Sequence, residues 1–159
     1  MFDELAEKTL VTLRAKGLTL ATAESCTGGL IAGALTAVAG SSDVVDRGFV
    51  TYSNQAKQEM LGVLKADLDS YGAVSDIVAR AMAEGGVKNA KTDMCVAVTG
   101  IAGPGGATET KPVGLVYLAC ARQGVKTVVE KQIFAGNRDE VREQTVKRAL
   151  ELVLVQGDA

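Results

Sequence analysis

The chain of 159 residues contains no histidine, and this absence excludes several kinds of active site at once. Ser-His-Asp and Cys-His catalysis need an imidazole base, and H-E-x-x-H zinc sites need imidazole ligands. A hydrolase built on this sequence must therefore find another base. A lysine removed from water is the best one available, because desolvation favours its neutral form.

Cysteines are few, and long apolar runs are missing. Cys26, Cys95 and Cys120 are the only cysteines, and their odd number and wide spacing suit neither a disulfide framework nor a C-x-x-C metal site. We therefore expect reduced thiols, a cytoplasmic location and no bound metal. No apolar run approaches the ~18 residues of a membrane span, and acids follow Met1 where a signal peptide needs basic residues, so no membrane association is expected.

Positive charge is not in excess, since 17 Lys and Arg face 19 Asp and Glu. A nucleic-acid partner is therefore disfavoured, because binding a phosphate backbone needs a basic surplus. Hydrophobic residues make up 47% of the chain and charged residues 23%, which is enough apolar surface to bury a core. The length suits one domain, and we expect residues 1–159 to form it.

Hydrophobic spacing predicts an alternation of helices and strands. The expected helices are 2–16, 27–38 with Thr27 as its cap, a short one capped by Asn54, 75–86, and a last one capped by Asn137; the expected strands are 18–23, 44–52, 94–99, 113–121 and 125–135. The last two strands should pair antiparallel, because only a short turn joins them. This order predicts an α/β fold, three-layer α/β/α with a mixed sheet, and ligands on such sheets lie at the carboxyl ends of parallel strands.

The first polar turn at that edge joins a strand to a helix start, where free N–H groups favour a developing oxyanion. Ser25 is the candidate nucleophile in it, and Cys26 is the competitor, because a thiol at a helix start can have a lowered pKa. Only one of the two is expected to face the cleft, since neighbouring side chains in extended backbone point to opposite sides. In the alternative interpretation, the next three residues only cap a packed helix: Thr27, Gly28 and Gly29.

The second polar turn carries Tyr52 and Lys57. Asn54 should place Lys57 in the first turn of a helix, where the positive end of the helix dipole disfavours a protonated amine. In a chain without histidine, Lys57 is the candidate base for Ser25, with the Tyr52 hydroxyl relaying or orienting the proton. The alternative is an ordinary solvated surface lysine.

The third polar turn is a glycine-rich stretch after Thr99, and bare backbone N–H groups in such a loop can converge on an anion. It has neither the spelling of a P-loop nor the strand-to-helix context of a Rossmann fingerprint, and a flexible connection is the alternative. Arg138 begins the last helix, where a bidentate contact with phosphate competes with a surface ion pair as its role.

Five segments together resemble the CinA C-terminal domain family: Ala23–Gly29, Thr51–Asn54 with Lys57, Gly72–Ser75, Thr99–Pro104 and Lys111–Gly114. The resemblance implies a mixed, mostly parallel five-stranded sheet, a homo-oligomer, and an amidohydrolase that converts nicotinamide mononucleotide to nicotinate mononucleotide and ammonia without a cofactor. It also implies Ser25 as the nucleophile, assisted by Lys57 and Tyr52. We expect the substrate, a small nucleotide, to meet these residues: Thr27, Gly28, Gly29, Thr99, Gly100, Gly103 and Arg138.

In the expected reaction, backbone N–H groups near Gly28 hold the oxyanion, and Lys57 takes the Ser25 proton directly or through Tyr52. Two other functions remain open from the sequence. One is a nucleotide-binding module without catalysis, because a fold does not guarantee an activity. The other is an amidase for a different phosphorylated amide.

Overall fold

The computed structural model describes all residues, 1–159, and has one central sheet. Its strands are β1 (Leu20–Glu24), β2 (Val45–Val50), β3 (Met94–Gly100), β4 (Leu115–Arg122) and β5 (Val125–Ile133). They lie in the order β2-β1-β3-β4-β5. β1 pairs parallel with β2 and β3, whereas β4 pairs antiparallel with β3 and β5, so β4 alone runs against the others. The mixed, mostly parallel five-stranded sheet is thus confirmed.

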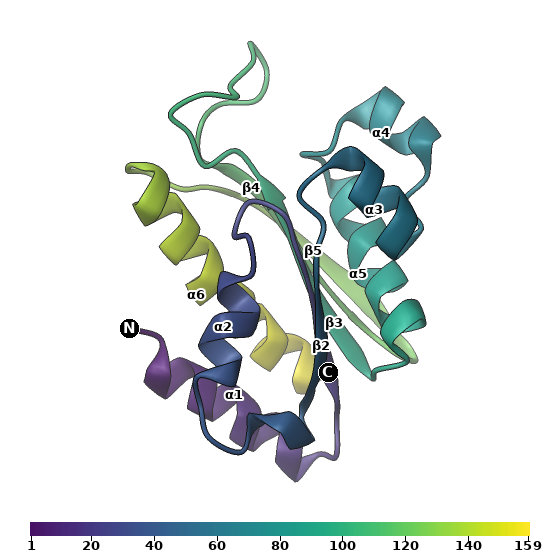
Figure 1. Cartoon of the computed structure of the whole chain (residues 1–159), viewed down its shortest axis with the longest axis vertical. Coiled ribbons are helices and arrows are strands. Elements are labelled where there is room, and N and C mark those ends of the chain that lie inside the picture. Colours follow the sequence, from purple (N-terminus) through teal and green to yellow (C-terminus); the bar gives the residue numbers. More distant parts are fainter.

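Helices cover both faces of this sheet, as the three-layer prediction requires (Figure 1). One face carries α1 (Asp3–Ala15), α2 (Leu30–Thr36) and α6 (Arg138–Gly157); the other carries α3 (Asn54–Leu61), α4 (Lys65–Tyr71) and α5 (Asp76–Ala90). A short 3-10 helix, η1 (Ser41–Asp43), precedes β2. None of the helices combines the length and the apolar character needed to cross a membrane.

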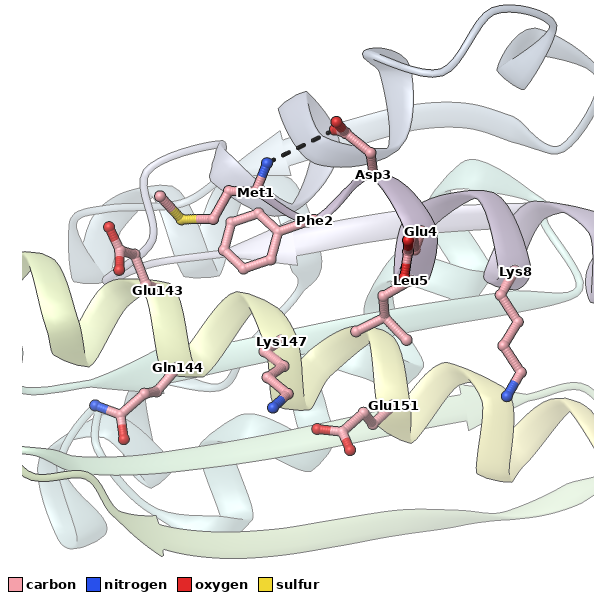
Figure 2. A pocket seen from close by; sticks show the side chains of 10 residues that line it. All are labelled: Met1, Phe2, Asp3, Glu4, Leu5, Lys8, Glu143, Gln144, Lys147 and Glu151. Atoms are coloured by element: carbon pink, nitrogen blue, oxygen red, sulfur yellow. Dashed lines mark ion pairs between the residues drawn. The ribbon is translucent and has the colours of Figure 1, made fainter.

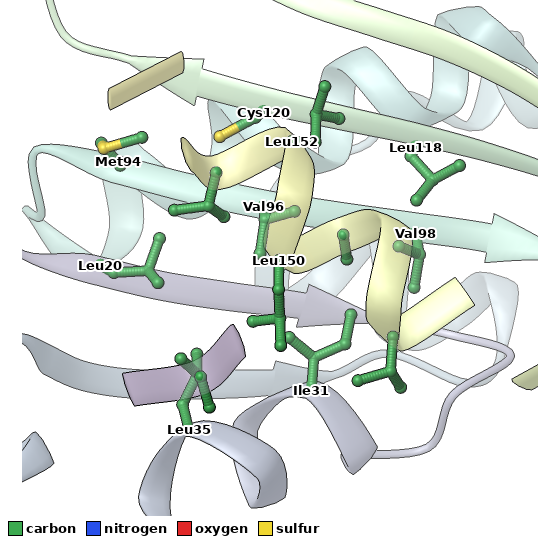
Figure 3. Packing of buried hydrophobic residues seen from close by; sticks show 14 of the residues in the cluster. Leu20, Ile31, Leu35, Met94, Val96, Val98, Leu118, Cys120, Leu150 and Leu152 are labelled. Atoms are coloured by element: carbon green, nitrogen blue, oxygen red, sulfur yellow. The ribbon is translucent and has the colours of Figure 1, made fainter. Parts of the chain in front are cut away.

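The larger apolar cluster, of 21 buried residues, fills the space between the sheet and α1, α2 and α6 (Figure 3). Leu20, Val96 and Leu118 project from the sheet towards Ile31 of α2 and Leu150 of α6. Full burial of such a side chain stabilises the fold by roughly 1.5–3 kcal/mol. A second cluster of 14 buried residues lies on the α5 face. Burial from both sides explains why β1 and β3 lack the alternation of a half-exposed strand.

The predicted end of a helix at Gly85 and Gly86 is wrong, because α5 continues to Ala90. A Cβ atom on Gly85 would lie 1.9 Å from the carbonyl oxygen of Leu61, and one on Gly86 would lie 2.3 Å from Sγ of Cys95. The two glycines therefore let α5 approach α3 and β3 closely. Packing, not helix termination, accounts for them.

Two of the three predicted helix caps are also wrong. α2 is preceded by Gly29 in a left-handed conformation, and the Thr27 hydroxyl instead donates to Oε1 of Glu24. α3 is capped by Ser53, whose Oγ accepts from the N–H of Ala56, so Asn54 is its first helical residue. The third cap is confirmed: Asn137 caps α6 and forms a capping box with Glu140. α5 is capped by Ser75, whose Oγ accepts from the N–H of Val78.

Candidate active site

A pocket of about 310 Å³ lies at the carboxyl ends of β1 and β3. Seven of the residues expected in the site line it: Ser25, Tyr52, Lys57, Thr99, Gly100, Gly103 and Arg138. The other three do not line it: Thr27, Gly28 and Gly29. Ala73 and Val74 line the pocket as well, although sequence reasoning gave them no role. The segment 72–75 had been singled out only as part of the family resemblance.

Ser25 and Lys57 meet directly at the base of this pocket. Ser25 directly follows β1, and α3 carries Lys57 back towards it, so that Lys57 Nζ donates to Ser25 Oγ at 3.0 Å. Ser25 is 8% exposed and Lys57 is 1% exposed. Lys57 Nζ also donates to the carbonyl oxygens of Thr51, at 2.8 Å, and Tyr52, at 3.3 Å. The lysine is therefore a buried group held by three acceptors and not a solvated surface residue.

Burial lowers the pKa of Lys57 from 10.5 to about 8, because removal from water penalises the ammonium form. None of the ion pairs in the structure includes Lys57, so no carboxylate restores its charge. A neutral amine has two hydrogens and one lone pair. With the hydrogens on the carbonyls of Thr51 and Tyr52, the lone pair is left for the hydroxyl of Ser25. The arrangement suits a general base.

The neighbouring thiol is in the opposite condition. Cys26 borders the pocket, but it is 5% exposed and belongs to the larger apolar cluster. Burial raises the pKa of Cys26 to about 12, which keeps the thiol protonated and weakly nucleophilic. Of the two candidate nucleophiles, only Ser25 has a base in hydrogen-bond contact. Cys95 and Cys120 are fully buried in the core, as their apolar surroundings in the sequence predict.

The turn after β1 uses several of its N–H groups internally. Gly28 N donates to the carbonyl oxygen of Ser25 at 3.0 Å, and Gly29 N donates to Oε1 of Glu24 at 3.3 Å. The N–H groups of Cys26 and Thr27 donate to no acceptor in the protein. Of these two residues only Cys26 lines the pocket, so its N–H is the free backbone donor next to Ser25 that a ligand can reach.

Tyr52 and Arg138 lie together at the pocket. The Tyr52 side chain is largely exposed, and its hydroxyl accepts from Nη2 of Arg138 at 3.2 Å. Nη1 of the same arginine donates to the carbonyl oxygen of Gly103 at 2.8 Å. The Tyr52 hydroxyl makes no hydrogen bond with Lys57; the tyrosine meets the lysine through its backbone carbonyl.

Thr99 and Arg142 connect the elements around the pocket. The buried Thr99 hydroxyl donates to the carbonyl oxygen of Ala73 at 2.9 Å, which joins the end of β3 to the segment before α5. Arg142 donates to the carbonyl oxygens of Cys26, at 3.1 Å, and Thr27, at 3.2 Å. It lies one helical turn after Arg138, and that spacing is the sequence signal that could have placed it at the same face.

A larger hollow, of about 790 Å³, lies between the first residues of the chain and α6 (Figure 2). Its lining has mixed charge, including Lys8 and Lys147 beside Glu143 and Glu151. It contains no serine, threonine or cysteine and so has no hydroxyl or thiol nucleophile. No group of three or more His, Cys, Asp or Glu side chains in the structure is placed to hold a metal ion. The pocket with Ser25 is therefore the candidate active site.

Known proteins resemble this chain closely in sequence and in fold. The family model of the CinA C-terminal domain matches residues 2–156. A protein of Escherichia coli strain K12 named nicotinamide-nucleotide amidohydrolase PncC is 46% identical over 153 residues, which cover 96% of this chain and 93% of that protein. A CinA-like protein of Syntrophobacter fumaroxidans is 49% identical over 152 residues, and this chain spans only 36% of its length.

The agreement extends to a solved structure. The crystal structure of competence/damage inducible protein CihA from Agrobacterium tumefaciens superimposes with a TM-score of 0.95 at 48% identity, covering 99% of this chain and 96% of that one. The sequence match and the fold therefore lead to the same conclusion. This chain belongs to the CinA C-terminal domain family.

Proposed function

We propose that this protein is an amidohydrolase that converts nicotinamide mononucleotide to nicotinate mononucleotide and ammonia, with Ser25 as nucleophile and Lys57 as base. One observation carries the proposal: Lys57 Nζ lies 3.0 Å from Ser25 Oγ in a pocket that no histidine shares. The substrate is suggested by the Escherichia coli relative, whose name states that activity.

The first half of the reaction forms an acyl-enzyme. Neutral Lys57 accepts the Ser25 proton while Oγ attacks the carboxamide carbon, and the carbonyl oxygen becomes an oxyanion. The free N–H group of Cys26 is the donor that we assign to this oxyanion. It replaces the N–H groups near Gly28 that the sequence suggests, because Gly28 N is already bonded to the carbonyl of Ser25.

The second half returns the enzyme to its starting state. The Lys57 ammonium protonates the leaving nitrogen, the carbon–nitrogen bond breaks, and ammonia departs. Water, deprotonated by Lys57, then attacks the ester, and Ser25 regains its proton as nicotinate mononucleotide leaves. Direct transfer between Lys57 and Ser25 suffices for both halves. A relay through the Tyr52 hydroxyl stays a prediction, since that group is bonded to Arg138.

Substrate recognition is assigned to the mouth of the pocket. Arg138 presents a guanidinium next to the loop after β3, and a guanidinium binds phosphate through paired, charge-assisted hydrogen bonds. The loop stands clear of the helices in Figure 1. A pocket of about 310 Å³ is at the small end of ligand sites, which run from roughly 300 to 1,000 Å³, so a mononucleotide suits it better than a dinucleotide. A homo-oligomer and a cytoplasmic location stay predictions.

The test is ammonia release from a panel of amides: nicotinamide mononucleotide, nicotinamide riboside, free nicotinamide and glutamine. Rapid release from the mononucleotide alone, absent in Ser25→Ala, is the expected result. Binding of the mononucleotide without turnover by the wild-type protein would favour a nucleotide-binding module. Preference for another phosphorylated amide would keep the chemistry and replace the substrate.

A further inference from the structure

Glu24 is a fully buried charged residue directly before Ser25, and the mechanism above gives it no part. Burying a carboxylate is costly unless hydrogen bonds or a cation compensate. No ion pair in the structure includes Glu24. The cost of burying this carboxylate must therefore be offset by hydrogen bonds from neutral donors, and the position of those donors indicates the role of Glu24.

All the donors belong to the turn after β1 and to the start of α2. Oε1 of Glu24 accepts from Thr27 Oγ1 at 2.5 Å, from Gly29 N at 3.3 Å and from Ile31 N at 2.9 Å. Oε2 accepts from Ala32 N at 3.0 Å. The carboxylate therefore binds the N–H groups that begin α2, a role that a residue adjacent to the helix normally performs. Gly29, the residue at that position, has no side chain to perform it.

The backbone of Glu24 connects the same residue to the base. Its carbonyl oxygen accepts from Thr51 N at 2.8 Å and from Thr51 Oγ1 at 3.2 Å. The carbonyl oxygen of Thr51 in turn accepts from Lys57 Nζ at 2.8 Å. Glu24 thus holds the turn that carries Ser25 through its side chain, and the segment that holds Lys57 through its main chain.

We propose that Glu24 is a positioning residue for the hydrolysis: its carboxylate fixes the turn 24–29, and thereby keeps Ser25 Oγ in contact with Lys57 Nζ. The substrate used to test this inference rests on the proposed function, whereas the hydrogen bonds of Glu24 do not depend on it. Misplacement of a reacting group by about 1 Å can cost about 100-fold in rate. A carboxylate is suited to the task because charged acceptors form stronger hydrogen bonds and favour a helix N-terminus.

The test compares Glu24→Gln with Glu130→Gln, which breaks a carboxylate pair with Arg148 away from the pocket. Gln keeps one acceptor oxygen, but its NH2 group cannot accept from the donors that bind the other carboxylate oxygen. We expect Glu24→Gln to lower kcat for nicotinamide mononucleotide about 100-fold while KM changes little, and Glu130→Gln to leave both unchanged. The pH at which activity reaches half its maximum should not move, because Glu24 acts on position and not on the charge of Lys57.

Three results would overturn the proposal: wild-type kcat in Glu24→Gln, an equal loss in Glu130→Gln, or a shift of the pH profile in Glu24→Gln. If Glu24→Gln does not fold, Thr27→Val removes one donor to the same carboxylate and should lower kcat about tenfold; no loss there counts against the role. If the wild type releases no ammonia, the proposed function fails separately. In that case the role of Glu24 is tested by the burst that accompanies acylation of Ser25 by p-nitrophenyl acetate. A burst in Glu24→Gln as large and as fast as in the wild type would reject the positioning role.

Discussion

Two regions of the molecule bury side chains with opposite effects on stability. One is the apolar face beneath α1, α2 and α6, and the other is the base of the pocket at the carboxyl edge of the sheet. In the apolar face, each side chain removed from water, such as Leu150, adds to stability. At the base of the pocket, Lys57 is removed from water without an ionic partner, which costs stability. The same burial lowers the pKa of Lys57, so the apolar face supplies stability while burial at the pocket changes the protonation of a polar group.

Two adjacent groups in the pocket show how burial selects the chemistry. Desolvation lowers the pKa of Lys57 to about 8 and raises that of Cys26 to about 12. In both cases burial shifts the equilibrium towards the neutral form, so the free amine of Lys57 forms at lower pH than that of a solvated lysine. A neutral amine is a base, whereas a neutral thiol is a poor nucleophile. The same environment therefore favours a base beside Ser25 and a protonated thiol at Cys26, as the proposed mechanism requires.

The largest effect should come from removing the nucleophile. Ser25→Ala is expected to lower kcat by at least about 10⁴-fold, because no other group with an adjacent base can form the acyl-enzyme. Binding of nicotinamide mononucleotide, measured by calorimetry, should be largely kept. Cys26→Ala is the matched variant and should retain most activity. An inactive Cys26→Ala with an active Ser25→Ala would transfer the mechanism to the thiol.

Replacing the base should separate activity from stability. Lys57→Met is expected to lower kcat by about 10³-fold or more, and Lys57→Arg should be nearly as damaging, because a guanidinium stays protonated. An arginine variant with wild-type turnover would reduce the role of Lys57 to that of a positive charge.

The same methionine variant should be more stable than the wild type at neutral pH. The pKa of Lys57 is about 8 in the folded chain against 10.5 for a free lysine. The unfolded chain therefore holds more protons between these values, and wild-type stability rises with pH across that window. Below about pH 8 the wild type carries the whole free-energy cost of burying the ammonium group. Lys57→Met removes that cost but also loses the lysine hydrogen bonds, so its free energy of unfolding at pH 7 should be higher by roughly 1–3 kcal/mol. Urea unfolding at pH 7 and pH 10.5 measures this, and an equal gain at both values would contradict the cause.

A cavity in the apolar face should do the reverse. Leu150→Ala removes a fully buried side chain of α6 and is expected to lower the free energy of unfolding by about 2–5 kcal/mol. Turnover per folded molecule should stay within about twofold below the melting transition, because no contact of the pocket is lost. Denaturant unfolding and kinetics on the same sample check both parts. A large fall in kcat at full occupancy of the folded state would show that the two regions are coupled.

Much of the architecture can be predicted from residue patterns. Apolar runs locate all five strands, and the short connection at Arg122–Gly124 predicts the antiparallel pair of β4 and β5. The absence of histidine directs attention to Lys57, and the strand-to-helix turn directs it to Ser25. The prediction of the strands succeeds because it depends on local periodicity. The roles of Lys57 and Ser25 depend on the chemistry that each residue type permits, and they stay predictions.

The features that sequence reasoning misses depend on contacts between distant residues. Glu24 caps a helix that begins six residues later, beyond the reach of rules that examine the residue adjacent to a helix. Gly85 looks like a helix end until the carbonyl of Leu61 is found against it. α4 went unpredicted because Leu68 is its only buried residue, so it has little apolar periodicity to detect.

Arg138, which we assign to the substrate phosphate, should affect activity less than Ser25 or Lys57 does. Arg138→Ala should lower kcat/KM for nicotinamide mononucleotide roughly 10- to 100-fold. This corresponds to a loss of about 1.5–3 kcal/mol of transition-state stabilisation, the range for a hydrogen bond to a charged group. The slow reaction of the phosphate-free riboside should barely change. Tyr52→Phe is the matched variant, since it removes the hydroxyl that accepts from Arg138 and leaves the guanidinium in place.

The comparison of the two substrates separates binding from structure at this arginine. Arg138 also donates to the carbonyl oxygen of Gly103, so its loss could loosen the loop after β3 instead of removing a phosphate contact. A loosened loop would penalise mononucleotide and riboside equally, whereas a lost phosphate contact penalises only the mononucleotide. Unchanged kinetics on both would leave the phosphate to Arg142 or to the glycine loop. Arg142 donates to the carbonyls of Cys26 and Thr27, whereas the partners of Arg138 lie outside the turn 24–29, so Arg138 can turn to a phosphate without disturbing the turn that carries Ser25.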